Sequence, residues 1–370
     1  MKKIAEYLDT VVPARLPSID LRVFHHGKEV FSYQKGTDDY RKEHPVSDNT
    51  LYWIYSMTKP VTMTAVMQCV ERGLLGLDDP VAKYIPAFEN MKVRDGDGVR
   101  PAKNVMTIRN LMSMAGGLDY DLQSPAVLEA TRDQNASTRR VVEAMAEKPL
   151  LFEPGEGYRY SLCHDVAAAV VEVVSGMTFG EFAKQNIFEP LKMKDTTFRE
   201  TPENRARLAA QYKAKEEGYE IYPFRNQYML TNAYDSGGAG LITSAADYGK
   251  FVSAMSMAFT AENPILGKDA INEMRRPQLS DELLKAYGYS KFRQGYSYGL
   301  GVRTMLHPEV ENAKSPVGEF GWDGAAGSVC FMDPEGEIAM CYLTTVMSCP
   351  FSYFELFPNL RDMIYNELQK

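Results

Sequence analysis

Residues 55–73 read "YSMTKPVTMTAVMQCVERG", and the interpretation of the whole chain depends on this stretch. Ser56 and Lys59 stand three residues apart at the start of a run that predicts a helix ending at Gly73. Positions i and i+3 of a helix lie on one face, so the Lys59 ammonium can reach the Ser56 hydroxyl. The free N–H groups at a helix start would also stabilise negative charge on the serine oxygen.

The Ser-x-x-Lys pattern is typical of one group of serine acyl-transfer enzymes, in which the lysine assists the serine. If Lys59 is buried, loss of hydration would lower its pKa and allow it to act as a general base near neutral pH. A second copy, Ser32 and Lys35, falls in a predicted hairpin, where residues three apart point to opposite faces of the sheet. The geometry therefore favours Ser56 and Lys59.

Ser297 is a third candidate, because "GYSYG" at 295–299 matches the nucleophile motif Gly-x-Ser-x-Gly. That motif needs a helix after the serine, followed along the chain by an acidic residue and a histidine. The residues after Ser297 have the pattern of a strand, and no acidic residue separates Ser297 from His307, the only later histidine. We expect Ser297 to be structural.

Composition excludes several classes of protein. The 370 residues are 45% hydrophobic and 24% charged, which is enough for a large core. A net charge of −8 argues against a nucleic-acid partner. Five cysteines without C-x-x-C spacing predict neither a disulfide framework nor a zinc site. Without an apolar run of membrane-spanning length or an export signal, the chain is expected to be soluble, cytoplasmic and free of the membrane.

The order of the predicted elements indicates an α+β fold. Residues 19–35 and 328–346 each have the pattern of a β-hairpin, and the segments between them are mostly helical. We expect an antiparallel sheet built from both chain ends and flanked by helices, with an inserted helical domain. The sheet domain would comprise residues 1–80 and 230–370, and the insertion residues 81–229.

Residues 55–86 resemble the serine-lysine segment of the class C β-lactamase and penicillin-binding-protein superfamily. Further blocks resemble the family in the same order: "MTIRNLMSMAGGLDY" at 106–120, "PGEGYRYSLCHDV" at 154–166, "GGAGLITSAADYGKF" at 237–251 and "FGWDGAAGS" at 320–328. Together they cover most of the chain from about residue 50 to 345. The resemblance implies a β-lactamase/transpeptidase-like fold.

Two family motifs differ here from their usual form. The Tyr-x-Asn motif, whose tyrosine carries protons, falls on Tyr160 and lacks its asparagine, since Leu162 takes that place. The Lys-Thr-Gly motif falls on Trp322, Asp323 and Gly324, and so lacks the cation that binds the carboxylate of a penicillin or peptide. Both variants are similar to the branch with family VIII carboxylesterases and the lovastatin acyltransferase.

The resemblance implies an oxyanion hole formed by the N–H groups of Ser56 and Ala325. Two other motifs receive no catalytic role. "SDN" at 47–49 copies a class A β-lactamase motif but precedes the nucleophile, so we expect a turn. His164 stands in no metal-binding pattern and is expected to be a solvent-side or core histidine.

The sequence thus predicts a serine hydrolase that cleaves esters of small or short-chain acyl groups. Ser56 would form the acyl-enzyme, with Lys59 and Tyr160 as general base and acid, and residues 322–324 would contact the substrate. The partner would be a small-molecule ester, and no metal or cofactor is expected. A β-lactamase or D,D-peptidase, an acyltransferase to an alcohol and a non-catalytic sensor remain alternatives, and no oligomeric state is predicted.

Overall fold

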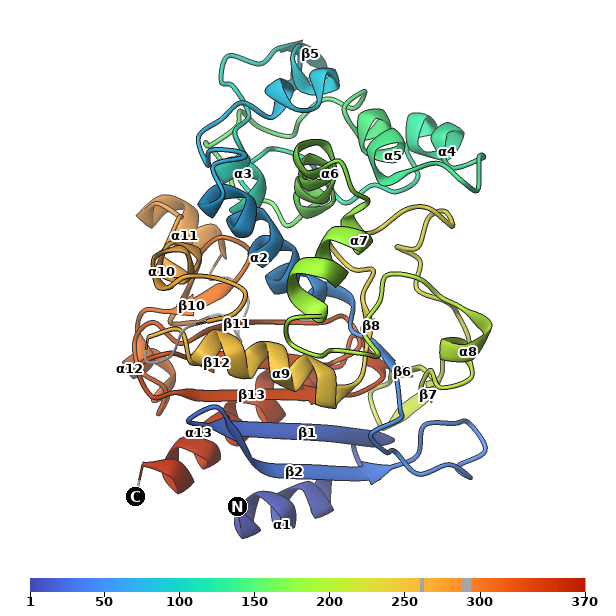
Figure 1. The fold of residues 1–370 in the computed structure, drawn as a ribbon, viewed down its shortest axis with the longest axis vertical. Helices are drawn as coiled ribbons and strands as arrows, with labels where there is room; N and C mark the ends of the chain where they lie inside the picture. The colour runs from blue at the N-terminus through green and yellow to red at the C-terminus, as the bar shows by residue number, and fades with distance from the viewer. Residues whose placement is uncertain (260–262, 288–293, 370) are drawn as a thin grey trace.

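The computed structural model describes residues 1–369 except 260–262 and 288–293 (Figure 1). Its main sheet has seven strands, all pairs antiparallel, in the order β2-β1-β13-β12-β11-β10-β9. The strands are β1 (Ser18–His25), β2 (Lys28–Gly36), β9 (Tyr296–Tyr298), β10 (Arg303–Met305), β11 (Phe320–Asp323), β12 (Val329–Asp333) and β13 (Ile338–Leu343). Both predicted hairpins are confirmed as β1–β2 and β12–β13.

The two ends of the chain meet inside this sheet. Strand β1 pairs with β13 from Asp20 opposite Leu343 to His25 opposite Ile338. The terminal amine of Met1 also forms an ion pair with Glu367 at 2.8 Å. The predicted fold class, an antiparallel sheet built from both chain ends, is therefore confirmed.

Helices cover both faces of the sheet and fill the upper part of Figure 1. They are α1 (Lys2–Val11), α2 (Thr58–Glu71), α3 (Ile108–Met112), α4 (Pro125–Ala130), α5 (Thr138–Met145), α6 (Cys163–Ser175), α7 (Phe179–Ala183), α8 (Pro202–Arg205), α9 (Ala245–Ser256), α10 (Lys268–Arg275), α11 (Asp281–Tyr287), α12 (Pro308–Glu311) and α13 (Phe357–Leu368). A short 3₁₀ helix, Tyr55–Met57, precedes α2 directly.

Alternation along the central strands assigns their side chains to two cores. In β13, Met340 and Tyr342 belong to the cluster shared with α1 and α13. Ala339 and Cys341, on the opposite face, belong to the larger cluster that includes α9. This period of two is the pattern expected of a sheet buried on both faces.

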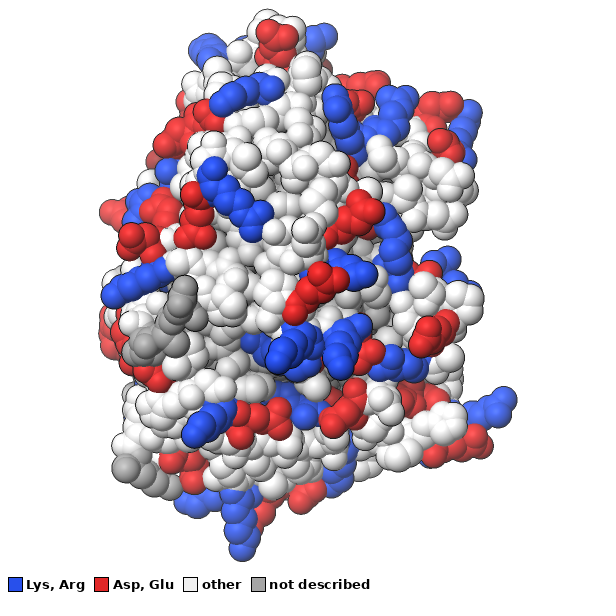
Figure 2. Space-filling view, viewed as in Figure 1, with Lys and Arg blue, Asp and Glu red and all other residues white. Residues whose placement is uncertain are grey.

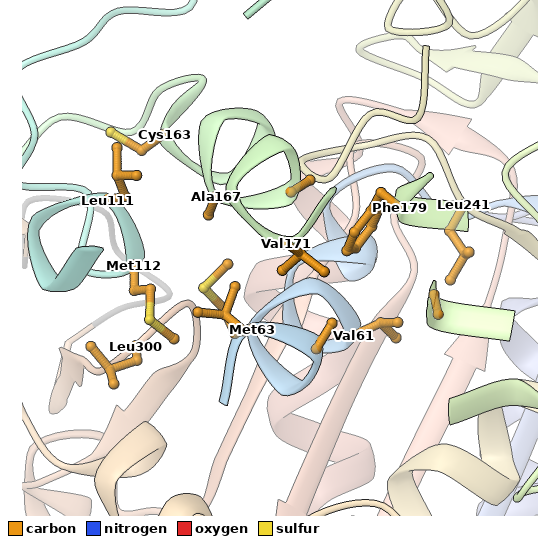
Figure 3. Packing of buried hydrophobic residues seen from close by; sticks show 14 of the residues in the cluster. Val61, Met63, Leu111, Met112, Cys163, Ala167, Val171, Phe179, Leu241 and Leu300 are labelled. Atoms are coloured by element: carbon orange, nitrogen blue, oxygen red, sulfur yellow. The ribbon is translucent and has the colours of Figure 1, made fainter. Parts of the chain in front are cut away.

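Helix α2 is the centre of the helical part, and Figure 3 shows Met63 of α2 beside Ala167 and Val171 of α6. Every residue of α2 from Thr58 to Cys69 is buried. The whole start of α2, including its polar side chains, therefore lies inside the protein.

The sequence signals for helix ends are confirmed in part. Gly176 follows an apolar run and predicts a helix end; α6 does end there, and the φ of Gly176 is a left-handed 72°. Thr178 and Glu181 have the spacing of a capping box, and they form one at the start of α7. The glycines at 116 and 117 likewise predict the end of the helix before them, but α3 stops earlier, at Met112. Ser244 and Asp247 also have the spacing of a capping box. Ser244 caps α9, but the Asp247 carboxylate accepts hydrogen bonds from the Asp195 N–H and from Lys250 instead of completing the box.

The remaining strands form small sheets. Strands β6 (Tyr212–Ala214) and β7 (Tyr219–Ile221) join β14 (Val346–Met347), β3 (Tyr52–Trp53) pairs with β8 (Ile242–Thr243), and β4 (Lys92–Asp95) pairs with β5 (Gly98–Pro101). Because β6 lies within the predicted insertion and β14 near the C-terminus, the two predicted domains share a sheet. The boundaries at residues 80 and 230 stay a prediction.

Charges of both signs are interspersed on the face drawn in Figure 2. The expectation that the chain binds no nucleic acid stays a prediction.

Within the described part of the chain, no single helix is long and apolar enough to cross a bilayer. One bent pair of helical segments, Cys163–Ser175 and Phe179–Phe188 at 78°, has the length and composition to do so.

Replacing Leu8 by alanine tests whether α1 covers the sheet. Leu8 is fully buried against β1 and α13, so the cavity left behind should cost about 2–5 kcal/mol in the free energy of unfolding. Urea unfolding measures this loss, and Lys3→Ala on the exposed face of α1 serves as the control. A loss below about 1 kcal/mol in Leu8→Ala would contradict this packing.

Candidate active site

Ser56 and Lys59 lie together at the junction of the 3₁₀ helix and α2. The Lys59 ammonium donates a hydrogen bond to Ser56 Oγ at 3.2 Å and another to the Gly238 carbonyl at 2.8 Å. Lys59 is fully buried. Desolvation lowers its pKa to about 7, although the negative charges of Asp165 and Asp323 act in the opposite direction. The structure therefore brings together the pair that the sequence selected, with the lysine in a state suited to proton transfer.

The residue before Ser56 has an unusual backbone conformation. Tyr55 has a φ of 47°, a left-handed value that is costly for a bulky side chain. Its hydroxyl donates a hydrogen bond to Gln211 Oε1, and its ring packs edge-on against Tyr228 at 6.3 Å. These contacts hold the sharp bend that carries Ser56, which no sequence pattern predicts.

The turn after β11 approaches the same bend closely. A Cβ atom at Gly324 would lie 2.2 Å from the Ile54 carbonyl oxygen, so only glycine permits this approach. The next residue, Ala325, is half-buried, and none of the described residues accepts a hydrogen bond from its N–H. The glycine of the predicted third motif thus has a structural cause, and the turn brings the Ala325 backbone against the Ser56 segment.

Tyr160 lies between two aromatic rings next to Lys59. Its ring stacks on Trp322 at 5.8 Å and on Tyr120 at 5.7 Å, with interplanar angles of 26° and 28°. The Lys59 ammonium lies 4.5 Å from the centre of the Tyr160 ring. Trp322 Nε1 donates a hydrogen bond to the Tyr160 hydroxyl at 3.2 Å. The residues that the second and third motifs named are therefore in direct contact.

Tyr120 belongs to the same cluster, and sequence reasoning assigned it no role. Its hydroxyl lies 3.4 Å from Lys59 Nζ and also forms a hydrogen bond with Ser56. Burial raises the pKa of Tyr120 well above its usual value, so this phenol is neutral at pH 7. The only signal was its place at the end of the block at 106–120, since a loop residue has no fixed spacing to Ser56.

Asp323 is half-buried at the end of β11. Its charge is among those that favour the protonated form of Lys59, so the carboxylate acts on the region around the serine. Trp322 is almost completely buried and packs edge-on against Tyr298 at 5.1 Å. The third motif thus contributes an aromatic wall and a negative charge here.

The competing motifs lie elsewhere. Ser297 is buried in the middle of β9, and a strand follows it where the elbow motif needs a helix. Ser32 is exposed on β2, where Lys35 pairs with Asp9 of α1. His164 is a core residue, as expected: its Nε2 lies 3.1 Å from the Met112 carbonyl, and burial keeps its pKa well below the usual value.

The segment "SDN" forms a turn, as expected, and its Asp48 pairs with Arg22 of β1 at 2.5 Å. Among the described residues, one group has the arrangement of a possible metal site: Asp38, Asp39 and His44, in the loop after β2. The Asp39 carboxylate accepts three N–H groups of its own loop, which accounts for the cluster without an ion. The expectation of a metal-free site stays a prediction.

Comparisons with known proteins agree with this geometry. The sequence profile of the Beta-lactamase family matches residues 4–362. Esterase EstB of Burkholderia gladioli is 28% identical over 380 aligned positions, which span 93% of this chain and 89% of the esterase.

Solved structures also share the fold over nearly the whole chain. EstCE1, described as a hydrolase with promiscuous acyltransferase activity, has a TM-score of 0.81 at 24% identity and covers 98% of this chain and 97% of its own. Simvastatin synthase (LovD) of Aspergillus terreus has a TM-score of 0.81 at 20% identity, with coverage of 100% and 98%. The chain therefore belongs to the beta-lactamase family, as a serine hydrolase or a related enzyme.

Proposed function

We propose that this protein is a serine carboxylesterase that cleaves small-molecule esters of short acyl groups through an acyl-enzyme on Ser56. The observation that carries the proposal is the buried Lys59, with a pKa of about 7, at 3.2 Å from Ser56 Oγ. Such a lysine is partly neutral at pH 7 and can accept the serine proton. The similarity to an esterase across 93% of the chain supports the same reaction class.

In the proposed acylation step, neutral Lys59 takes the proton as Ser56 Oγ attacks the ester carbonyl. The oxyanion that forms is stabilised by the N–H groups of Ser56 and Ala325. Tyr160 relays the proton from the Lys59 side to the leaving alcohol. Tyr120, whose hydroxyl contacts both Ser56 and Lys59, keeps these two side chains next to each other.

Deacylation follows the same path in reverse. The Lys59–Tyr160 pair removes a proton from water, which attacks the acyl carbonyl. The bond to Ser56 Oγ then breaks, the pair returns the proton to this oxygen, and the acid is released. An alcohol in the place of water would give acyl transfer by the same steps. The promiscuous acyltransferase activity in the description of EstCE1 makes this the second candidate function.

Substrates with a carboxylate are disfavoured by the third motif. Trp322 supplies no cation, and the charge of Asp323 opposes a second negative group at short range. The β-lactamase and D,D-peptidase alternatives therefore have less support than the esterase. A cytoplasmic location stays a prediction.

Parallel assays on a short p-nitrophenyl ester, a chromogenic cephalosporin and a D-Ala-D-Ala peptide test the substrate class. We expect the neutral ester to have the highest kcat/KM, because residues 322–324 lack a carboxylate-binding cation. A higher kcat/KM for the cephalosporin or the peptide would overturn the esterase assignment.

The same ester assay identifies the nucleophile. Ser56→Ala should abolish turnover, whereas Ser297→Ala, the matched control from the competing motif, should retain most of it. Ester turnover that survives in Ser56→Ala would place the reaction elsewhere.

The pH dependence tests Lys59. Because the neutral amine is the active form, kcat/KM should rise with pH through about 7 and level off above it. Lys59→Arg should lose on the order of 10²-fold or more, because arginine stays protonated. A flat profile from pH 5 to 9, or an active Lys59→Arg enzyme, would remove the lysine from the mechanism.

Replacing each tyrosine by phenylalanine separates the two phenols, since the rings and their stacking are kept. Tyr160→Phe should reduce kcat on the order of 10²-fold as a proton carrier. Tyr120→Phe should cost less, since it removes the hydrogen bonds that position Ser56 and Lys59 but not the proton carrier. Single-turnover acylation rates and melting temperatures measure both effects. If Tyr120→Phe is the more damaged, the proton carrier is Tyr120.

A further inference from the structure

The mechanism above leaves one buried carboxylate next to the site unused. Asp165 lies on α6 and is 1% exposed. Its Oδ1 accepts two hydrogen bonds of 2.7 Å, from the Tyr234 hydroxyl and from Ser236 Oγ. Burial raises the pKa of Asp165, while these two bonds and the Lys59 charge favour its ionised form. Asp165 thus holds the start of the loop at residues 234–241, which we call the glycine loop.

The other side of the glycine loop is bound to α2. Lys59 Nζ donates to the Gly238 carbonyl at 2.8 Å, and Thr62 Oγ1 donates to the Gly237 carbonyl at 2.7 Å. The Leu241 N–H donates to Thr58 Oγ1 at 3.0 Å. The loop therefore joins α2, which carries Lys59, to α6, which carries Asp165.

Two glycines allow the loop to fit between these helices. A Cβ atom at Gly237 would lie 2.6 Å from the His164 carbonyl oxygen, and one at Gly238 would lie 2.6 Å from Asp165 Oδ2. The Asp165 carboxylate thus packs directly against Gly238, whose carbonyl accepts a hydrogen bond from Lys59. A shift of this carboxylate would move the carbonyl that orients the ammonium.

The charges around Lys59 come from several elements. Two carboxylates favour its protonated form, Asp165 on α6 more strongly than Asp323 on β11, whereas burial raises the pKa of the neighbouring Cys163 thiol to about 11 and keeps it neutral at pH 7. The neutral phenol of Tyr120 and the ring of Tyr160 face it from two loops, and His164 is kept uncharged in part by Lys59 itself. Among these charges, Asp165 has the largest effect in raising the pKa of Lys59 against the effect of desolvation.

We propose that Asp165 is a positioning residue for Lys59, which holds the glycine loop against α2 and places a negative charge behind the ammonium. This inference rests on the proposed role of Lys59 as base. Asp165 would fix two properties together: the direction of the amine toward Ser56, through the Gly238 carbonyl, and the pH at which the amine becomes neutral.

Asp165→Asn keeps the shape and removes the charge. Since a nearby negative charge favours the ammonium, its loss should move the acidic limb of the kcat/KM profile about 1 unit toward lower pH. The plateau should fall several-fold because the loop is held less well. Ser236→Ala removes one hydrogen bond to Asp165 but leaves the charge of Asp165. In this variant kcat should fall several-fold, and the acidic limb of the kcat/KM profile should stay at the wild-type pH.

Asp235→Asn is the matched control. Asp235 is a fully buried aspartate beside Ser236, but it pairs with Arg199 and the Gly180 N–H and is not among the charges acting on Lys59. Its removal should lower the melting temperature and leave the acidic limb unmoved. If Asp165→Asn does not fold, Asp165→Ser removes the same charge and makes the same test.

An acidic limb that stays within about 0.2 unit of wild type in the charge-removing variant would overturn the electrostatic role. Wild-type kcat in Ser236→Ala would overturn the positioning role. Both outcomes presuppose ester turnover that depends on Ser56, so they differ from a failure of the proposed function, in which Ser56→Ala retains activity.

Discussion

The site depends on the removal of one ammonium group from water. Lys59 is enclosed by α2, by α6, by the glycine loop and by two stacked tyrosines, and desolvation outweighs every negative charge around it. A lysine this deeply buried needs hydrogen-bond acceptors in fixed positions, which Ser56 and Gly238 supply. The packing of the helical part is therefore what lowers the pKa of Lys59. For this reason the polar first turn of α2 is as buried as its apolar middle.

Much of this arrangement could be predicted from the sequence. Ser56 and Lys59 were identifiable because helix geometry relates residues three apart, and the hairpins because alternation reports a strand with a buried face. Trp322 and Gly324 were found by resemblance, and their contacts with Tyr160 and the Ile54 carbonyl account for the variant motif. The Ser56–Lys59 pair and the hairpins are predictable because their residues are close in the sequence. Trp322 and Gly324 are predictable because they belong to a family motif.

The features that were missed depend on tertiary contacts. Tyr120 reaches Lys59 from a loop 61 residues away along the chain, and Asp165 acts through the glycine loop about 70 residues after it. The left-handed Tyr55 has no local cause in its residue type, because a tyrosine normally avoids that conformation. The pairing of β6 with β14 likewise joins distant segments, so hydrophobic periodicity could not reveal it.

The pairing of β1 with β13 also bears on how the protein is made. Strand β1 leaves the ribosome early, but its neighbour β13 is separated from it by more than 300 residues, as the register of Asp20 with Leu343 shows. Until that neighbour is synthesised, one edge of β1 and the apolar faces of the first hairpin lack their partners. Contacts this distant in sequence make folding slow and late. The nascent chain is therefore expected to depend on chaperones during synthesis, and the turn after β11 can reach Ser56 only when the long segment between them has emerged.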